Sequence, residues 1–217
     1  TSLTIHNLRF QGVYDIPTVR YWSGLSDYVF NKDALKVGYR DANMLKGGLT
    51  YSNVITTVSQ TYAGEIQSAY YGEALDAHLR YHSGKLRGIV NGIDYDIWNP
   101  ATDGRLYANY DIASVLEQKK ENKRQLQEEL GLVQDGHKFV IGLISRLTDQ
   151  KGLDLVNAIL PQVMDEHTQV VVLGTGDRVY EDSLRYYEYA YGGNVCSNFI
   201  FYETGSNVIY SGADALL

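Results

Sequence analysis

The sequence has little of what marks secreted, membrane-spanning or nucleic-acid-binding proteins. Cys196 is its one cysteine, which excludes an internal disulfide and fits a reducing compartment. No apolar run in the sequence is long enough to cross a membrane. The chain carries 26 acidic and 19 basic side chains, a formal net charge of −7. This balance, with no run rich in lysine and arginine, argues against a general nucleic-acid surface.

The nearest approach to a basic run is KKENKR, from Lys119 to Arg124. Glu121 and Asn122 interrupt it, and it lies in a stretch of helical pattern that Gly131 closes. We interpret it as a solvated helix face. The chain has 217 residues and is 44% hydrophobic, which is ordinary for a soluble globular protein and enough for one large domain or two smaller lobes.

Strand-like and helix-like segments alternate along most of the chain. The early part predicts a strand ending at residue 6, a helix at 45–51, a strand at 53–59, a helix at 60–71 and a strand at 86–90. After the irregular stretch NGIDYDIWNP, the pattern predicts strands at 139–144, 169–174 and 199–202 and helices at 153–164 and 178–191. Such alternation implies parallel sheets with right-handed crossovers, so we expect an α/β fold in two parts.

The stretch ISRLTDQKG places two cations between a predicted strand and the helix after it. Thr148 or Asp149 is a candidate N-cap, and Arg146 and Lys151 flank them. A helix N-terminus already favours an anion, so two added cations make a phosphate or diphosphate the natural ligand. For an isolated pair at this spacing, solvated charges beside a tight turn are the commoner explanation.

The next strand ends in a second turn of interest, GTGD. Gly174 and Gly176 let a ligand approach the backbone closely, and Asp177 is placed to cap the following helix. Tight turns often need glycine for their own geometry, so this motif alone is weak. Adjacent strand ends of a parallel sheet converge on one ligand crevice, however, and the two turns together strengthen the prediction of a binding site.

Several blocks of the sequence resemble bacterial glycogen synthases and plant starch synthases, in the family's order and over nearly the whole chain. The blocks are TIHNLRFQG, NMLKGGLTYSNVITTVSQTYAGEI, NGIDYDIWNPATD, ISRLTDQKGLDL, LGTGDRVYE and IYSGADALL. The resemblance implies a GT-B fold of two Rossmann-like lobes with parallel sheets, each only partly present. Residues 1–90 would be the C-terminal part of the acceptor-side lobe, 91–137 the connection and its helix, and 138–217 the N-terminal part of the nucleotide-sugar lobe.

The resemblance also implies a reaction. The family transfers glucose from ADP-glucose or UDP-glucose to the non-reducing end of an α-1,4-glucan, retains the anomeric configuration and uses neither a metal nor another cofactor. The sequence does not separate ADP-glucose from UDP-glucose, and it leaves the oligomeric state open. The expected location is the bacterial cytoplasm, or the plastid stroma if the source is a plant.

Two cations match the family's donor-phosphate pair. Breaking the glucose–phosphate bond builds negative charge on the departing diphosphate, which fixed cations stabilise more in the transition state than in the ground state. Arg146 is suited to bind two oxygens at once, and Lys151 supplies a point charge. Gly174 and Gly176 match donor-binding positions beside them.

The resemblance assigns three further contacts. His6 matches a histidine against the donor glucose, with a structural histidine at a strand end as the alternative. Asn91 matches a polar contact at the inter-lobe face, with a turn-forming asparagine as the alternative. Phe201 falls where the family has an aromatic side chain on the nucleobase. Tyr202 is the neighbouring candidate, and a core role for either is the alternative.

One apparent motif is not assigned to metal binding. Asp94 and Asp96 form a D-x-D, which holds a metal in other glycosyltransferases, but here it lies in the NGIDYDIWNP block, where the family gives it no such role. We expect it to order a turn. The sequence departs from the family at Arg9 and Phe10, where Ala and Tyr are commoner, and at Asn207, where His is usual.

The resemblance places a donor-binding lysine of a K-x-G-G-L block before Thr1 and a catalytic glutamate of an E-P-C-G-L block after Leu217. We therefore expect an internal part of a longer enzyme, inactive and poorly folded on its own. The alternatives are a non-catalytic protein that binds a nucleotide sugar or glucan, and another retaining GT-B transferase of the sucrose synthase kind.

Overall fold

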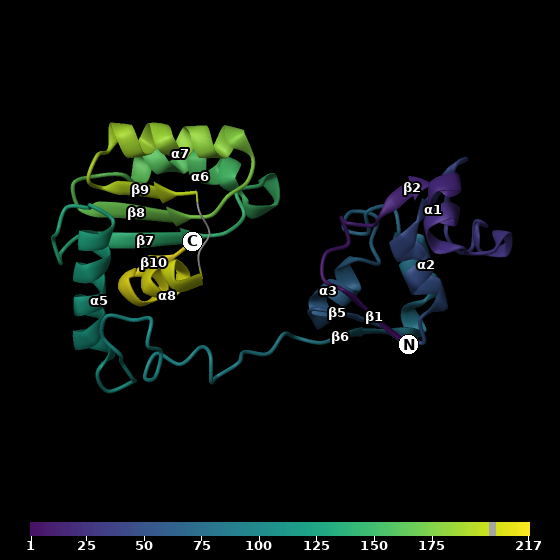
Figure 1. Ribbon diagram of the computed structural model, residues 1–217, viewed down its shortest axis with the longest axis horizontal. Coiled ribbons are helices and arrows are strands. Elements are labelled where there is room, and N and C mark those ends of the chain that lie inside the picture. The colour runs from purple at the N-terminus through teal and green to yellow at the C-terminus, as the bar shows by residue number, and fades with distance from the viewer. Residues whose placement is uncertain (200–202) are drawn as a thin grey trace. The chain divides into compact units, whose positions relative to one another are not determined.

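The computed structural model describes residues 1–199 and 203–217. These residues form two compact units, Thr1–Ile93 and Asp94–Leu217, each with its own hydrophobic core (Figure 1). Each unit contains a parallel sheet with helical crossovers, so the predicted α/β class is confirmed. Within the described residues, no helix combines the length and the apolar character that crossing a bilayer requires.

The first unit is built on a parallel sheet in the order β1-β5-β6. Its elements are β1 (Ser2–Ile5), α2 (Met44–Tyr51), β5 (Val54–Thr57), α3 (Gln60–Glu65), α4 (Asp76–Tyr81), the 3-10 helix η2 (Ser83–Lys85) and β6 (Leu86–Gly88). Asn43 caps α2 by accepting from the Lys46 N–H at 2.9 Å, and Ser59 caps α3 by accepting from the Tyr62 N–H at 2.9 Å. The core between sheet and helices includes Ile5, Leu49, Ile55, Ile66, Leu79 and Leu86.

A small antiparallel sheet follows β1, which the sequence did not predict. Its strands have the order β2-β4-β3 and are accompanied by a short α-helix and a 3-10 helix: β2 (Val13–Asp15), α1 (Ile16–Ser23), η1 (Asp27–Val29), β3 (Lys36–Val37) and β4 (Asp41–Asn43). Asp15 caps α1 by accepting from the Thr18 N–H at 2.9 Å. Strands of two or three residues carry no readable period, so hydrophobic patterning has nothing to detect here.

The second unit has a parallel sheet in the order β10-β7-β8-β9 within the described residues. Its elements are α5 (Val115–Glu129), β7 (Phe139–Ile144), the 3-10 helix η3 (Asp149–Lys151), α6 (Leu153–Val163), β8 (Thr168–Leu173), α7 (Arg178–Ala190), β9 (Val195–Asn198), α8 (Glu203–Gly212) and β10 (Ala215–Leu216). Helices α6 and α7 cover one face of this sheet, and α5 and α8 cover the other (Figure 1).

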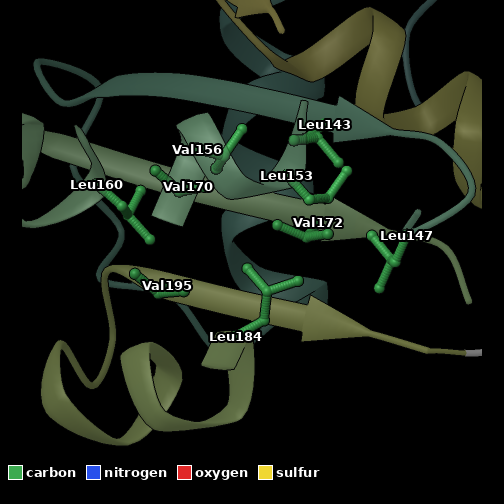
Figure 2. Packing of buried hydrophobic residues seen from close by; sticks show 9 residues of the cluster. All are labelled: Leu143, Leu147, Leu153, Val156, Leu160, Val170, Val172, Leu184 and Val195. Atoms are coloured by element: carbon green, nitrogen blue, oxygen red, sulfur yellow. The ribbon is translucent and has the colours of Figure 1, made fainter. Parts of the chain in front are cut away.

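Strand β8 is buried on both faces, which explains its unbroken apolar run. Val170 and Val172 pack with α6 and α7 in the cluster of Figure 2, while Val171 and Leu173 pack with α5 and α8 on the opposite face. Central strands of parallel sheets read as continuous hydrophobic runs for this reason. The same double burial makes β8 the centre of the second unit's core.

Two predicted elements are misplaced. The strand expected at 199–202 is wrong at its first residue, because β9 is Val195–Asn198 and Phe199 follows it; residues 200–202 lie outside the described residues. The helix expected at 60–71 ends at Glu65. There the Ser68 hydroxyl donates to the Glu65 carbonyl at 2.7 Å, a local hydrogen bond that replaces a helical one.

Candidate functional site

Two loops meet where β7 and β8 end, and backbone hydrogen bonds hold them together. The Leu147 N–H donates to the Thr175 carbonyl at 2.9 Å, and the Asp177 N–H donates to the Leu147 carbonyl at 2.8 Å. Leu147 is fully buried and pairs with Gly176 in an isolated parallel bridge. The turns carrying SRLTDQKG and GTGD are therefore locked to each other, as the sequence predicted from adjacent strand ends.

The glycines of GTGD have a structural reason of their own. A Cβ at Gly174 would lie 1.8 Å from the Ser145 carbonyl oxygen, and a Cβ at Gly176 would lie 2.2 Å from the Leu147 carbonyl oxygen. No side chain fits at either position without moving the backbone of the other loop. Close passage of the two loops thus requires glycine, and contact with a ligand at these positions stays a prediction.

Arg146 and Lys151 both lie on the first of these loops. Both are exposed, and neither has an ion pair or side-chain hydrogen bond within residues 1–199 and 203–217. Leu147, next to Arg146, is buried and anchors the loop in the core. Within the described residues the loop therefore presents two cations that make no ion pair, at the carboxyl ends of the strands, where parallel α/β sheets bind ligands.

The N-terminus of α6 lies on the same loop. The expectation that Thr148 or Asp149 caps this helix is wrong: η3 intervenes, and Gly152, with φ +68°, occupies the cap position without a side-chain hydrogen bond. Gly152 takes this position because η3 ends in the left-handed backbone conformation that glycine adopts most readily. The first N–H groups of α6 are thus without a side-chain cap, which suits an anion.

The cap of α7 differs from expectation in a similar way. Asp177 occupies the N-cap position, but its side chain makes no capping hydrogen bond. Glu181 instead reaches back and accepts from the Gly176 N–H at 3.1 Å. The carboxylate that steadies this turn therefore comes from the first turn of the helix, a position that a capping pattern does not single out.

In the first unit, His6 and Asn91 both lie beyond the carboxyl ends of strands in the parallel sheet. His6 directly follows β1, Asn91 lies three residues beyond β6, and both are exposed. A buried residue that the sequence did not single out links two of these strand ends. The Thr57 hydroxyl, at the end of β5, donates a hydrogen bond of 2.8 Å to the Ile5 carbonyl at the end of β1. Thr57 thus ties the end of β5 to the residue immediately before His6.

The connecting segment begins with a turn ordered by Asp94. Its carboxylate accepts from the Asp96 N–H at 2.9 Å and the Ile97 N–H at 3.2 Å. This geometry agrees with the turn-ordering role predicted for the D-x-D pair. The pattern is an Asx turn, in which an aspartate side chain satisfies backbone donors two and three residues ahead.

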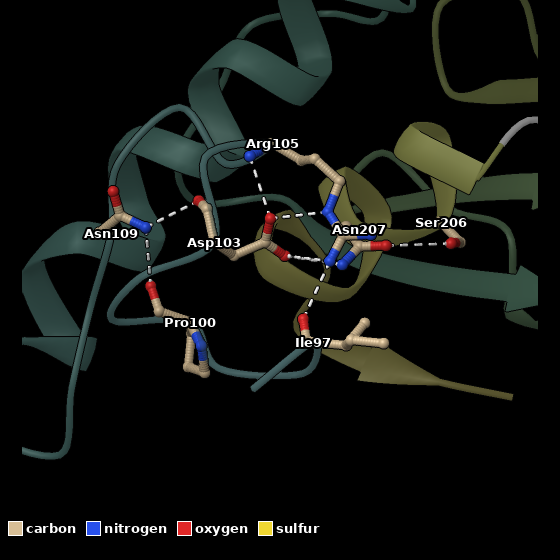
Figure 3. Close-up of polar contacts among 7 residues, drawn as sticks. All are labelled: Ile97, Pro100, Asp103, Arg105, Asn109, Ser206 and Asn207. Carbon is tan, nitrogen blue, oxygen red and sulfur yellow. Dashed lines mark hydrogen bonds and ion pairs between the residues drawn. The ribbon is translucent and has the colours of Figure 1, made fainter. Parts of the chain in front are cut away.

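A buried carboxylate organises the rest of this segment (Figure 3). The side chain of Asp103 is 6% exposed and accepts from Arg105 Nε at 2.6 Å and Nη2 at 2.9 Å, and from Asn207 Nδ2 at 2.7 Å. Arg105 also donates to the Ile97 carbonyl at 3.0 Å. Hydrogen bonds from Arg105, together with its charge and a bond from Asn207, hold the pKa of Asp103 below its usual value.

Two buried amides attach this segment to helices α5 and α8 of the same unit. Asn207, on α8, is 4% exposed and meets Asp103. Asn122, on α5, is fully buried and exchanges hydrogen bonds of 2.7 and 3.2 Å with the backbone of Ala108. The sequence signalled one of them only as a departure from the family, at Asn207. The remaining candidate, Phe201, lies outside the described residues.

Comparison with known proteins agrees with the motifs. The model of the starch synthase catalytic domain family matches residues 1–81. A glycogen synthase of Lachnospira eligens is 50% identical over 215 residues, which are 99% of this chain and 45% of that protein. A glycogen synthase of Thermotoga petrophila is 51% identical over 217 residues, or 100% of this chain and 44% of that protein. The chain thus spans somewhat less than half the length of the curated relatives it matches.

A solved structure is similar over the same extent. The catalytic domain of starch synthase IV from Arabidopsis thaliana, bound to ADP and acarbose, matches with a TM-score of 0.90 and 31% identity, over 99% of this chain and 45% of that one. The α/β fold of GT-B type, expected from the motifs, is confirmed by this match. Sequence blocks, parallel sheets and relatives agree: the chain belongs to the glycogen and starch synthase family.

Proposed function

We propose that this protein takes part in retaining transfer of glucose from ADP-glucose to the non-reducing end of an α-1,4-glucan. The observation that carries the proposal is the pair of exposed cations, Arg146 and Lys151, on a loop locked to the end of β8; within the described residues neither makes an ion pair. A diphosphate is the group that two cations and an uncapped helix N-terminus together suit. ADP is favoured over UDP because the similar plant structure was solved with ADP.

The chemistry follows from where charge develops. As the bond between glucose and diphosphate breaks, the leaving diphosphate gains negative charge, and the Arg146 guanidinium and Lys151 ammonium stabilise it. Because glycines let the two loops pass at backbone distance, the loop carrying both cations is held before the donor arrives, so little reorganisation is needed. In this proposal the two cations take the role that a metal ion has in other transferases, and no metal is required.

The acceptor side of the proposal rests on the first unit. His6 and Asn91 emerge from one edge of its parallel sheet, and the family resemblance gives them contacts with the donor glucose and the inter-lobe face. The glucan is proposed as acceptor because the bacterial relatives are glycogen synthases. The same relatives make the bacterial cytoplasm the proposed location.

The test replaces the matching segment of the Thermotoga petrophila glycogen synthase with these 217 residues and measures glucose transfer from ADP-glucose to glycogen. We expect activity in this chimera. Arg146→Ala or Lys151→Ala should each lower turnover by a factor on the order of 10²–10³, typical for loss of one group that stabilises a transition-state charge. Arg124→Ala, which removes a cation from the exposed face of α5, is the matched control and should leave turnover unchanged.

Three results would contradict the proposal or part of it. Turnover within a few-fold of the parent chimera after both substitutions would show that the diphosphate lies elsewhere. A chimera that binds ADP and glucan but transfers no glucose would favour the non-catalytic alternative. Activity that disappears on chelation and returns with added Mg²⁺ would contradict the metal-free part of the proposal.

A further inference from the structure

A second cluster of cations lies in the first unit. It lines a cavity of about 560 Å³ between the loop after η1, the helix α2 and the helix α4. The cavity has two lysines, Lys32 and Lys46, against one carboxylate, Asp33, although the whole chain carries a net charge of −7. The other lining residues are Val37, Ala74, Leu75, Ala77, His78 and Tyr81.

Lys46 is held in place rather than loosely solvated. Its Nζ donates to the Lys32 carbonyl at 2.6 Å and to the Lys36 carbonyl at 2.9 Å, which leaves one of its three protons for another acceptor. Lys32 is exposed, and its side chain has no ion pair or hydrogen bond within the described part of the chain. The cavity thus has one ammonium group held by hydrogen bonds and one exposed ammonium group.

Further basic groups lie close to His78. His78 Nε2 lies 3.1 Å from the Thr50 hydroxyl, and its ring packs edge-on against His82 at 4.6 Å. Burial, then the nearby His82 and Lys46, lower the pKa of His78 to about 4, so the imidazole is neutral at pH 7. The titratable or charged groups around it are Lys46 on α2, Tyr81 on α4, His82 directly after α4, Lys85 on η2, and Lys32 and Asp33 on the loop.

We propose that this cavity binds a phosphate group, free or as the monoester of a small metabolite, at a site separate from the β7 and β8 loops. Lys32 and the remaining proton of Lys46 are the charged donors, and the apolar wall of Val37, Leu75 and Ala77 accommodates the rest of a monoester. The volume lies in the range of small-molecule pockets and exceeds what phosphate alone fills. A bound dianion also adds to the single negative charge, that of Asp33, which faces these basic groups.

The experiment uses the Thermotoga petrophila chimera carrying Arg146→Ala and Lys151→Ala, so that phosphate binding at the β7 loop does not contribute. Isothermal titration with inorganic phosphate and with glycerol 3-phosphate measures saturable binding at pH 7. We expect both to bind, and the monoester to bind more tightly because it also contacts the apolar wall. Equal affinities would assign the site to free phosphate, which the proposal includes.

Single substitutions then locate the site. Lys32→Gln should weaken binding about fivefold and Asp33→Asn should strengthen it by a similar factor, which is typical for one partly exposed charge. Arg40→Gln is the matched control, since it removes a cation of the same unit that does not line the cavity. Because Lys32 and Asp33 are exposed, these variants do not depend on the structural hydrogen bonds of Lys46.

Absence of saturable binding, or equal weakening by Lys32→Gln and Arg40→Gln, would overturn the proposal. Lowering the pH from 7 to 5.5 should weaken binding, because a phosphate monoester, with a second pKa of about 6, loses its second negative charge in this range. The imidazole of His78, whose pKa is lowered to about 4, stays neutral and adds no compensating charge. Binding that strengthens on acidification would contradict a dianion as the ligand. The outcome is independent of glucosyl transfer, since the titration is carried out with the donor-site cations removed.

Discussion

The two units hold the loops at the carboxyl ends of their sheets in different ways. In the second unit the loops after β7 and β8 touch through their backbones, and glycine at Gly174 and Gly176 makes that approach possible. In the first unit Gly88 allows one such approach, since a Cβ there would lie 2.2 Å from the Ser59 carbonyl oxygen, and side chains add further connections. The Thr57 hydroxyl donates to the Ile5 carbonyl, and Gln11 bridges Asn43 at 2.5 Å and the Glu73 carbonyl at 2.8 Å.

The two kinds of connection should respond differently to amino-acid substitution. At a backbone crossing, any added Cβ forces the two loops apart, so the whole contact is lost. A side-chain bridge loses one hydrogen bond when a residue changes, and the neighbouring bridges remain. We therefore expect substitutions at a backbone crossing to cost more free energy of unfolding than substitutions at a side-chain bridge.

The largest effect should come from adding a methyl group to the backbone crossing. Gly176→Ala places a Cβ 2.2 Å from the Leu147 carbonyl oxygen, so the loops must separate. We expect a loss of about 3 kcal/mol in the free energy of unfolding of the second unit, the upper range for overpacking. Urea denaturation measures it. Gly192→Ala, where a Cβ would meet nothing within 4 Å, is the control, and equal losses in the two variants would refute the crossing as the cause.

A smaller effect is expected where the connecting segment docks on α8. Asp103→Asn keeps the shape but removes the charge that accepts from Arg105 and Asn207, and should cost about 2 kcal/mol at pH 7, as hydrogen bonds to charged groups do. The measurement is urea unfolding of parent and variant across pH 2–7, and Glu117→Gln, on an exposed ion pair, is the control.

The pH dependence of that cost has a definite sign. The pKa of Asp103 is lowered in the folded protein, so its stabilisation is complete above the unfolded value of about 4 and is lost as the pH falls through the folded value. The difference between parent and variant should therefore be constant from pH 7 to about 4.5 and shrink below it. A difference that grows on acidification would contradict the role of the charge.

The smallest loss of stability is expected for the side-chain hydrogen bond at the carboxyl ends of β1 and β5. Thr57→Val removes the hydroxyl that donates to the Ile5 carbonyl and keeps the shape of the side chain, so we expect a loss of about 1 kcal/mol. Thr56→Val is the matched control, because the Thr56 hydroxyl pairs with Thr4 at an exposed position. If Thr57→Val destabilised as much as Gly176→Ala, the distinction between a backbone crossing and a side-chain bridge would fail.

Much of the fold was readable in advance. The strands β5, β7 and β8 and the helices α2, α5, α6 and α7 were predicted within a few residues, because each carries a long apolar or periodic pattern. The small sheet of β2, β3 and β4 was missed because its strands are too short to show a period. The position of strand β9 was predicted wrongly because the run FIFY is more apolar than VCSN. The strand forms at VCSN because these residues pair with β8.

The sequence by itself determined the α/β class, the family and the order of the candidate site residues, because these depend on motifs and on patterns local to the chain. Only the tertiary structure decided why Gly174 and Gly176 are glycines, how Thr57 holds the edge before His6, and that Asp103 and Asn207 meet from positions 104 residues apart. Contacts of this kind depend on which segments the fold brings side by side, and no local pattern in a single chain records them.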